Sequence, residues 1–114
     1  EALVSNTNQQ LVDIKYKDGI LPETFTLKQN FPNPFNPVTN INIEIGFSDN
    51  VKLKIFDIRG REIISLYDGN IQAGTYSFQW NGRNGLGELV SSGIYFYTLS
   101  NNSIIRTRKM LLMK

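Results

Sequence analysis

Two neighbouring segments in the middle of the chain alternate apolar and polar residues one by one. In TNINIEIGF, residues 39–47, the apolar positions are Ile41, Ile43, Ile45 and Phe47. In VKLKIFDI, residues 51–58, Val51, Leu53 and Ile55 alternate with Lys52 and Lys54. A period of two is typical of a β-strand with one buried face and one wet face. Because no segment sustains the 3.6-residue period of an amphipathic helix, the sequence predicts an all-β fold.

Short strand candidates and turns alternate through the rest of the chain. Further strand candidates are residues 61–67, 73–80, 92–100 and 104–114. The predicted turns are residues 57–61, with Gly60, the pair Asp68-Gly69, and the tight, irregular loop NGRNGLGE, residues 81–88. The segment SGIYFYTLS is apolar on both faces, which predicts a central strand between two layers. About seven strands in roughly 90 residues predict an immunoglobulin-like antiparallel β-sandwich, with a closed barrel as the alternative.

The heptapeptide FPNPFNP, residues 31–37, holds three of the four prolines of the chain. Proline fixes φ and lacks a backbone donor, so these residues exclude a helix interior and a central strand. The residues before each proline are biased toward extended geometry. The sequence therefore predicts a rigid, extended hinge to a preceding domain, docked through its aromatic rings Phe31 and Phe35.

The first 22 residues show no comparable order. We interpret residues 1–22 as a linker or the tail of a preceding domain, with LVDIKYK, residues 11–17, as a candidate edge strand. The β-sandwich domain is then residues 23–114. The chain starts without Met and without the pattern of a secretory signal. We therefore expect it to be a segment of a longer protein.

The residue types that are missing narrow the function. The chain has no cysteine and no histidine, which excludes thiol nucleophiles, disulfides, histidine bases and the commonest metal ligands. The carboxylates nearest the central strands, Asp57, Glu62 and Asp68, lie at turns or beside arginines, where capping and ion pairing explain them. We therefore expect no enzyme and no cofactor. A net charge of +2 does not indicate a nucleic-acid partner, and no apolar run approaches the ~20 residues of a membrane span.

Two groups of residues have an alternative functional interpretation. Trp80 with Tyr76, Tyr95 and Tyr97 could form a platform for a sugar ring, but alternating aromatics in a sandwich are more often core, because each buries a large area. The oxygens of the loop 81–88 could ligate calcium, but this loop has no aspartate and its glycine spacing is unlike an EF-hand. A buried aromatic cluster and a loose turn are the predictions.

Four motifs in order resemble a known family. They are NFPNPFNP (residues 30–37), VKLKIFDIRGREIISLYDG (51–69), AGTYSFQWNGRNGLGELVSSGIYFYTL (73–99) and RTRKMLLMK (106–114). Together, over about residues 28–114, they resemble the type A C-terminal sorting domain of type IX (Por) secretion, found on cargo of the Bacteroidetes and related bacteria. Residues 57–99 alone also resemble the immunoglobulin-like domain of the flagellar hook-cap protein.

The resemblance implies a non-catalytic secretion signal. Such domains carry an exported cargo through an outer-membrane translocon and are commonly removed by a surface peptidase, so the implied partners are that translocon, its peptidase and a preceding cargo domain. The implied location is the medium or the outer-membrane surface, reached through the periplasm. The positions carried over are Pro32, Asn33, Pro34, Phe35, Gly60, Arg61, Gly93, Tyr95, Lys109 and Lys114. One departure is Trp80-Asn81-Gly82, where Trp-Asp-Gly is frequent.

The last strand has two interpretations. Arg106, Arg108 and Lys109 could guard an edge against unwanted pairing, or the strand and its basic end could offer β-augmentation or carboxylate capture to a receptor. Two other functions stay open: a carbohydrate-binding or adhesive accessory module of a secreted enzyme, and an assembly scaffold of the hook-cap kind. A solvent-exposed Trp80 would favour the sugar module, whereas a buried Trp80 with a free, basic last strand would favour the sorting signal.

Overall fold

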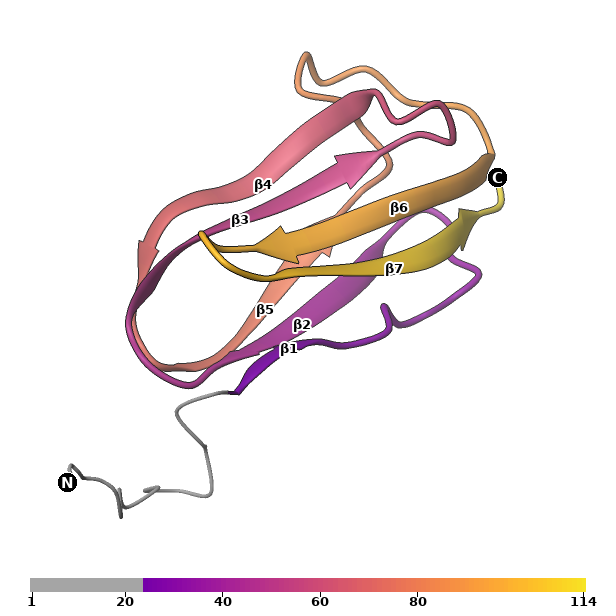
Figure 1. Cartoon of the computed structure of the whole chain (residues 1–114). Helices are drawn as coiled ribbons and strands as arrows, with labels where there is room; N and C mark the ends of the chain where they lie inside the picture. Colours follow the sequence, from indigo (N-terminus) through magenta and orange to yellow (C-terminus); the bar gives the residue numbers. More distant parts are fainter. Residues whose placement is uncertain (1–23) are drawn as a thin grey trace, which may run out of the picture.

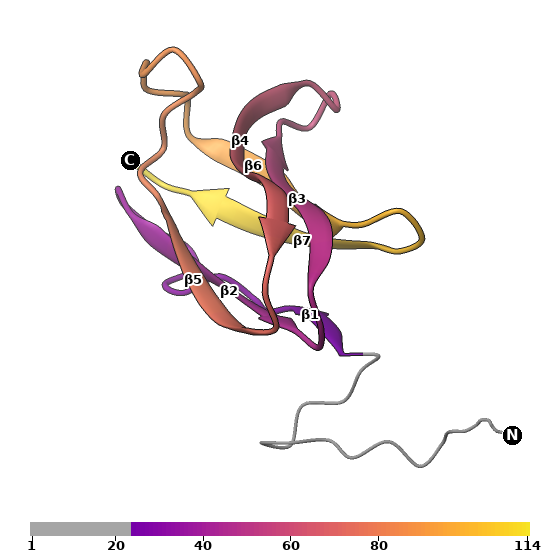
Figure 2. The same ribbon diagram turned by 90° about the vertical axis from the view of Figure 1, so that its left-hand side faces the viewer.

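Two antiparallel sheets face each other in the computed structural model, which describes residues 24–114 (Figure 1). The strands are β1 (Phe25–Leu27), β2 (Thr39–Ile45), β3 (Asp49–Phe56), β4 (Glu62–Ile71), β5 (Gly74–Trp80), β6 (Gly93–Ser100) and β7 (Ile105–Leu112). One sheet has the order β1-β2-β5 and the other β4-β3-β6-β7. Figure 2 shows the two sheets as separate layers. The predicted immunoglobulin-like sandwich is confirmed.

The N-terminal predictions fall largely beyond this range. The linker of residues 1–22 and its candidate strand 11–17 lie outside the described residues. The seventh strand is instead Phe25–Leu27, which pairs with Ile43 to Ile45 of β2. Residues 24–114 contain no helix that could cross a membrane.

The period of two in the sequence matches the burial of β2 and β3. Ile41, Ile43 and Ile45 are at most 1% exposed, and the apolar positions of β3 are buried to the same extent. The lysines of β3 and the asparagines of β2 lie on the opposite faces. Phe47 departs from the prediction, because β2 ends at Ile45 and leaves this ring 54% exposed.

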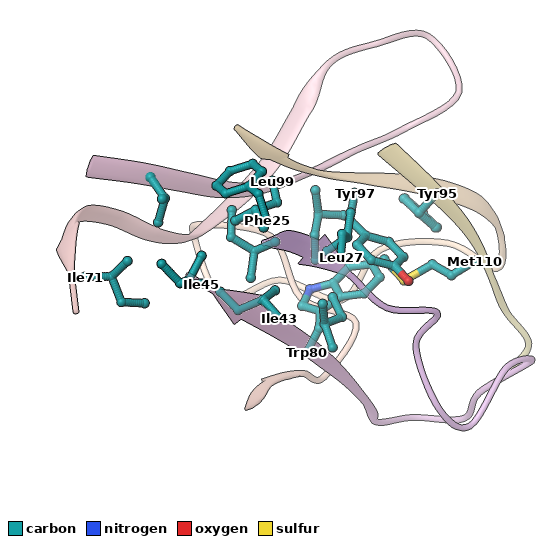
Figure 3. Packing of buried hydrophobic residues seen from close by; sticks show 14 of the residues in the cluster. Phe25, Leu27, Ile43, Ile45, Ile71, Trp80, Tyr95, Tyr97, Leu99 and Met110 are labelled. Carbon is teal, nitrogen blue, oxygen red and sulfur yellow. The ribbon is translucent and has the colours of Figure 1, made fainter. Parts of the chain in front are cut away.

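Sixteen buried apolar residues fill the space between the sheets (Figure 3). Trp80 lies among them at 1% exposure, and its indole N–H donates to the carbonyl of Arg83 at 2.8 Å. Tyr95 and Tyr97 are also buried, whereas Tyr76 is only partly buried. The prediction that these aromatics form core is therefore confirmed for Trp80, Tyr95 and Tyr97.

Two expected secondary-structure features are wrong. Asp68 and Gly69 do not form a turn, because β4 continues through them and pairs them with Lys52 and Val51. The strand β6 is central in its sheet, but only its alternate residues face the core, and Ile94 on the other face is 41% exposed. No second layer covers that outer face within residues 24–114, so the apolar residues there stay partly in solvent.

A buried polar cluster fastens the chain before the heptapeptide to β6. The phenol of Tyr97 accepts a hydrogen bond from the backbone N–H of Asn30 at 2.7 Å and donates to the carbonyl of Lys28 at 2.8 Å. The amide of Asn30 donates to Thr39 Oγ1 at 2.9 Å, and that hydroxyl donates to the carbonyl of Pro32 at 2.8 Å. Asn30 and Thr39 are both buried, so each polar group needs these partners.

The Tyr97 phenol should make stability depend on pH in alkaline solution. Burial raises the pKa of Tyr97 above its ordinary value of 10.0, although the Asn30 bond and Arg108 act in the other direction. The folded state therefore favours the neutral phenol, and its stability holds below about pH 10 and falls as pH rises through the raised pKa. Urea midpoints measured through this range should fall more steeply for the native chain than for Tyr97→Phe. An equal fall of the urea midpoint with pH in both proteins would contradict the role of the Tyr97 phenol.

Candidate functional site

The heptapeptide is an internal loop of the domain, between β1 and β2. It runs through bends at residues 32–34 and 36–37, and the peptide bonds before Pro32, Pro34 and Pro37 are cis. The predicted extended hinge is therefore wrong, because β1 precedes the loop and pairs with β2. Docking through Phe35 is confirmed, since its ring is 2% exposed and lies 5.6 Å from Trp80, centroid to centroid. Phe31 is 77% exposed and does not dock.

Backbone pairing joins the heptapeptide to the end of β7. The N–H of Phe35 donates to the carbonyl of Leu111, and the N–H of Met113 donates to the carbonyl of Phe35, both at 3.0 Å. The side-chain oxygen of Asn33 accepts from the N–H of Leu111 at 3.0 Å. The first and last motifs of the resemblance thus form one unit with a parallel bridge between Phe35 and Leu112.

The third motif packs directly beside this unit. Gly93 is the β6 partner of Leu112, and Tyr95 is the partner of Met110. The ring of Tyr95 lies 5.3 Å from Trp80, and its hydroxyl donates to the carbonyl of Ser91 at 2.7 Å. We name the residues Asn33, Phe35, Trp80, Gly93, Tyr95 and Leu112 the motif cluster. It gathers the first, third and fourth motifs at one end of the sandwich.

The second motif forms the turn between β3 and β4. The carboxylate of Asp57 accepts from the backbone N–H groups of Arg59 and Arg61, and from Arg61 Nε at 2.8 Å. These bonds, with the backbone N–H of Arg61 first, hold the pKa of Asp57 below its ordinary value. Gly60 closes the turn with φ at +83°, in the left-handed region that glycine occupies without strain.

A groove connects the second motif to the motif cluster. It has a volume of about 420 Å³ and lies between the turn at residues 57–61 and the start of β6. Arg61, Gly93 and Tyr95 line it together with Ser91 and Ser92. The hydroxyl of Ser92 also accepts from the backbone N–H of Lys114 at 3.1 Å. The structure therefore places the four motifs next to one another.

The remaining predicted positions lie at the surface of this region. Pro32, Asn33 and Pro34 are exposed, as are Lys109 and Lys114. Lys109 is paired with Phe96, outside the core, and its carbonyl accepts from the amide of Gln29 at 2.8 Å. Sequence reasoning missed the contribution of Gln29, and no local signal marks it, because its partner is 80 residues away.

The outer edge of β7 is covered at its end and carries basic side chains along the rest of its length. Arg106 Nε donates to the carbonyl of Phe25 at 3.3 Å, and Arg108 Nε donates to the carbonyl of Leu27 at 2.7 Å. Gln29 and Asn33 occupy the outward backbone groups of Lys109 and Leu111. The interpretation as a guarded edge is supported by the basic side chains that face β1 and by the groups that cover the last residues of β7. β-augmentation by a receptor stays a prediction for the rest of this strand.

Asn84 organises the glycine-rich loop. Its side-chain oxygen accepts from the N–H groups of Leu86 and Glu88 at 2.9 and 3.0 Å, and its amide donates to Glu88 Oε1 at 3.1 Å. Arg83 Nη1 adds a bond to the carbonyl of Gly87. These bonds agree with the predicted tight, irregular loop, and the expectation of a loose turn is wrong. Among residues 24–114 no group of three or more acidic residues is positioned to hold a metal ion.

Comparison with solved structures identifies relatives of the fold. The latent, dimeric PorU from Porphyromonas gingivalis superposes with a TM-score of 0.63 at 21% identity, over 84% of this chain and 10% of PorU. PorZ, an essential bacterial surface component of the type-IX secretion system of the same organism, gives a TM-score of 0.49 at 20% identity, over 75% of this chain and 11% of PorZ. The chain thus spans about a tenth of the length of either protein.

The comparison of sequences gives a more direct assignment. None of the curated proteins compared with the chain matches it. The family model of the FlgD Ig-like domain matches residues 34–103, which is more than half of the chain. The match includes the whole of residues 57–99, for which the sequence resembles the immunoglobulin-like domain of the hook-cap protein. The chain therefore belongs to the family of FlgD Ig-like domains.

Proposed function

We propose that this domain is a non-catalytic sorting signal that directs an exported bacterial protein through the type IX outer-membrane translocon. The observation that supports the proposal most is that positions from all four motifs, among them Phe35, Arg61 and Gly93, lie at one end of the sandwich. Asn33 and Phe35 bond to residues 111–113, and Gly93 pairs with Leu112. The stability of a sandwich does not require these positions to lie together at one end, whereas a recognition surface does.

The exposed side chains around the motif cluster suggest what a receptor would contact. Pro32, Pro34, Lys109 and Lys114 are all exposed, and Arg61 lines the neighbouring groove. Lys109 and Lys114 suit a partner with carboxylates, because lysine binds them through charge-assisted hydrogen bonds. Arg61 already forms an ion pair with Asp57. In this proposal the partners are the translocon, its surface peptidase and a preceding cargo domain, and the location is the cell surface or the medium.

The alternatives are weaker on particular observations. Trp80 is 1% exposed, so it cannot stack on a sugar ring as the carbohydrate-binding alternative requires. Membership of the FlgD Ig-like family covers residues 34–103 and leaves out the last strand. A hook-cap scaffold therefore does not account for the bonds between the heptapeptide and residues 111–113.

A secretion assay tests the proposal. Residues 1–114 are placed behind a signal peptide and a fluorescent reporter in a type IX-competent bacterium, beside the same reporter without the domain. We expect the domain to bring the reporter to the surface or medium. The double variant Lys109→Ser, Lys114→Ser should leave most of it in the periplasm, because both lysines are exposed and neither side chain bonds to another group in residues 24–114.

The matched control removes the same charge elsewhere. Lys28→Ser with Lys52→Ser removes one exposed lysine just after β1 and one from β3, at the cost of one surface ion pair with Glu44. This control should be exported like the native domain, and both doubles should keep their unfolding free energy within about 0.5 kcal/mol. A reporter that stays in the periplasm with the native domain would overturn the sorting function. Normal export of the Lys109, Lys114 variant would remove these lysines from the recognition surface.

A further inference from the structure

The sandwich has four edge strands: β1 and β5 in one sheet, β4 and β7 in the other. An edge strand presents unpaired N–H and C=O groups that can pair with another chain. Soluble proteins protect such edges by short length, charges, proline, bulges or a covering segment. The four edge strands of this domain differ in this protection.

Three of the four edges are protected in different ways. β1 has only three residues. β7 carries the charges of Arg106, Arg108 and Lys109, and Gln29 and the heptapeptide cover its last residues. β4 has two register shifts, which leave Ile63 and Leu66 without partners in β3, and the carbonyl of Ile63 accepts from the N–H of Gly85 at 3.0 Å. Pairing along these edges is blocked or interrupted.

β5 has none of these protections. It pairs with β2 in an unbroken register from Trp80 to Gly74, and GTYSFQW contains neither a charged residue nor proline. Apart from the ladder with β2, no hydrogen bond reaches the backbone of residues 75–79 from anywhere in the described range. Seven regular residues thus leave one row of backbone groups free for another strand.

The side chains of β5 are complementary to a second copy of themselves. An antiparallel pair that uses all seven residues places Ser77 opposite Ser77. Tyr76 then faces Phe78 twice on the inner side, and Thr75 faces Gln79 twice on the outer side. Aromatic pairs and hydroxyl pairs across strands are favourable, and here no like charges meet.

We propose that β5 is a homodimer interface, through which two copies join their three-stranded sheets into one sheet of six strands around a two-fold axis. The contact is isologous, so it closes at two copies. Tyr76 and Phe78 are only partly buried in the single chain, and the second copy covers the side that β2 leaves open. A strand from another protein is the competing occupant. Because β5 carries no charge, it could not select a foreign strand by electrostatic attraction. In the self-pairing, every residue of β5 has a compatible residue opposite it.

A cysteine variant tests the register, because the native chain has no cysteine. In Ser77→Cys of the full 114-residue chain, the two sulfur atoms face each other across the axis and should form a disulfide-linked dimer under mild oxidation. Asn42→Cys is the matched control, since Asn42 is the β2 partner of Ser77, on the same face but away from the edge. It should crosslink at least about tenfold more slowly. Equal rates would overturn the proposal.

Sedimentation of the purified chain tests the association itself. The native chain should dimerise reversibly with concentration, and Ser77→Lys should raise the dimer dissociation constant by about tenfold because two lysines then face each other. Asn42→Lys adds the same charge to the same face and should leave the constant unchanged. A native chain that stays monomeric throughout, or a dimer that tolerates Ser77→Lys, would overturn the interface. Neither result depends on export, so the sorting function is tested separately.

Discussion

Phe35→Ala is expected to lower the free energy of unfolding by about 3–5 kcal/mol, the range for deleting a buried ring. The side chain is 2% exposed and packs against Trp80, so its loss leaves a cavity between the heptapeptide and the core. Trp80 is the single tryptophan of the chain, and its fluorescence reports the site directly during urea unfolding.

Phe31→Ala is the matched control for this variant. It removes the same kind of ring from the same heptapeptide, but that ring is 77% exposed, so the unfolding free energy should change by no more than about 0.5 kcal/mol. Similar losses for the two variants would mean that Phe35 does not dock the heptapeptide in solution.

Deletion of residues 110–114 is expected to unfold the domain. Met110 and Leu112 are 1% and 2% exposed, and losing two such side chains costs about 4–10 kcal/mol, comparable with the whole stability of about 5–15 kcal/mol for a typical domain. The deletion also removes the partners of Asn33 and Phe35. Circular dichroism and the urea transition of Trp80 measure the outcome.

The double lysine variant is the control for the deletion, because it alters the same segment without touching buried atoms. Its urea midpoint of unfolding should equal that of the native chain. A truncated chain that keeps a cooperative transition near the native midpoint would show that the end of β7 is dispensable for the fold. If the deletion unfolds the domain as expected, failed export of a truncated chain says nothing about recognition, and point variants are needed.

The strands that alternate most regularly were predictable from the sequence. β2 and β3 bury one face each, so a wrong register would expose Ile43 or Leu53 to water. The alternation therefore determines which face of each strand is buried. The two-layer architecture follows from several such strands with turns between them. The buried position of Trp80 follows from the same alternation in β5.

The features that sequence reasoning missed depend on partners far along the chain. The heptapeptide has the composition of a stiff linker, and its bonds to β2 and to residues 111–113 make it part of the sandwich. Likewise Asp68-Gly69 has the composition of a turn, but pairing with Val51 and Lys52 keeps it in β4. The preference of such residues for a turn is overridden where hydrogen bonds to a neighbouring strand continue past them.

For the same reason, only the motifs of the candidate site were predictable, and their arrangement in space was not. The motifs themselves are visible in the sequence, but nothing local indicates that Asn33, Gly93 and Leu112 meet, because strands distant in sequence bring them together. The cover over the end of β7 was similarly hidden, since the groups that form it come from Gln29 and Asn33. Composition could only suggest that its arginines guard an edge.

The two ends of the described chain have a mechanical consequence. β1 begins at one end of the sandwich and the chain leaves β7 at the other (Figure 1). Tension between these ends therefore runs along the strands, and interstrand hydrogen bonds stand across that direction. Such a load must shear many bonds at once instead of opening them one after another. The bonds of Phe35 to Leu111 and Met113 add a clamp near the point where force would enter. We therefore expect the domain to resist unfolding when force is applied between its two ends.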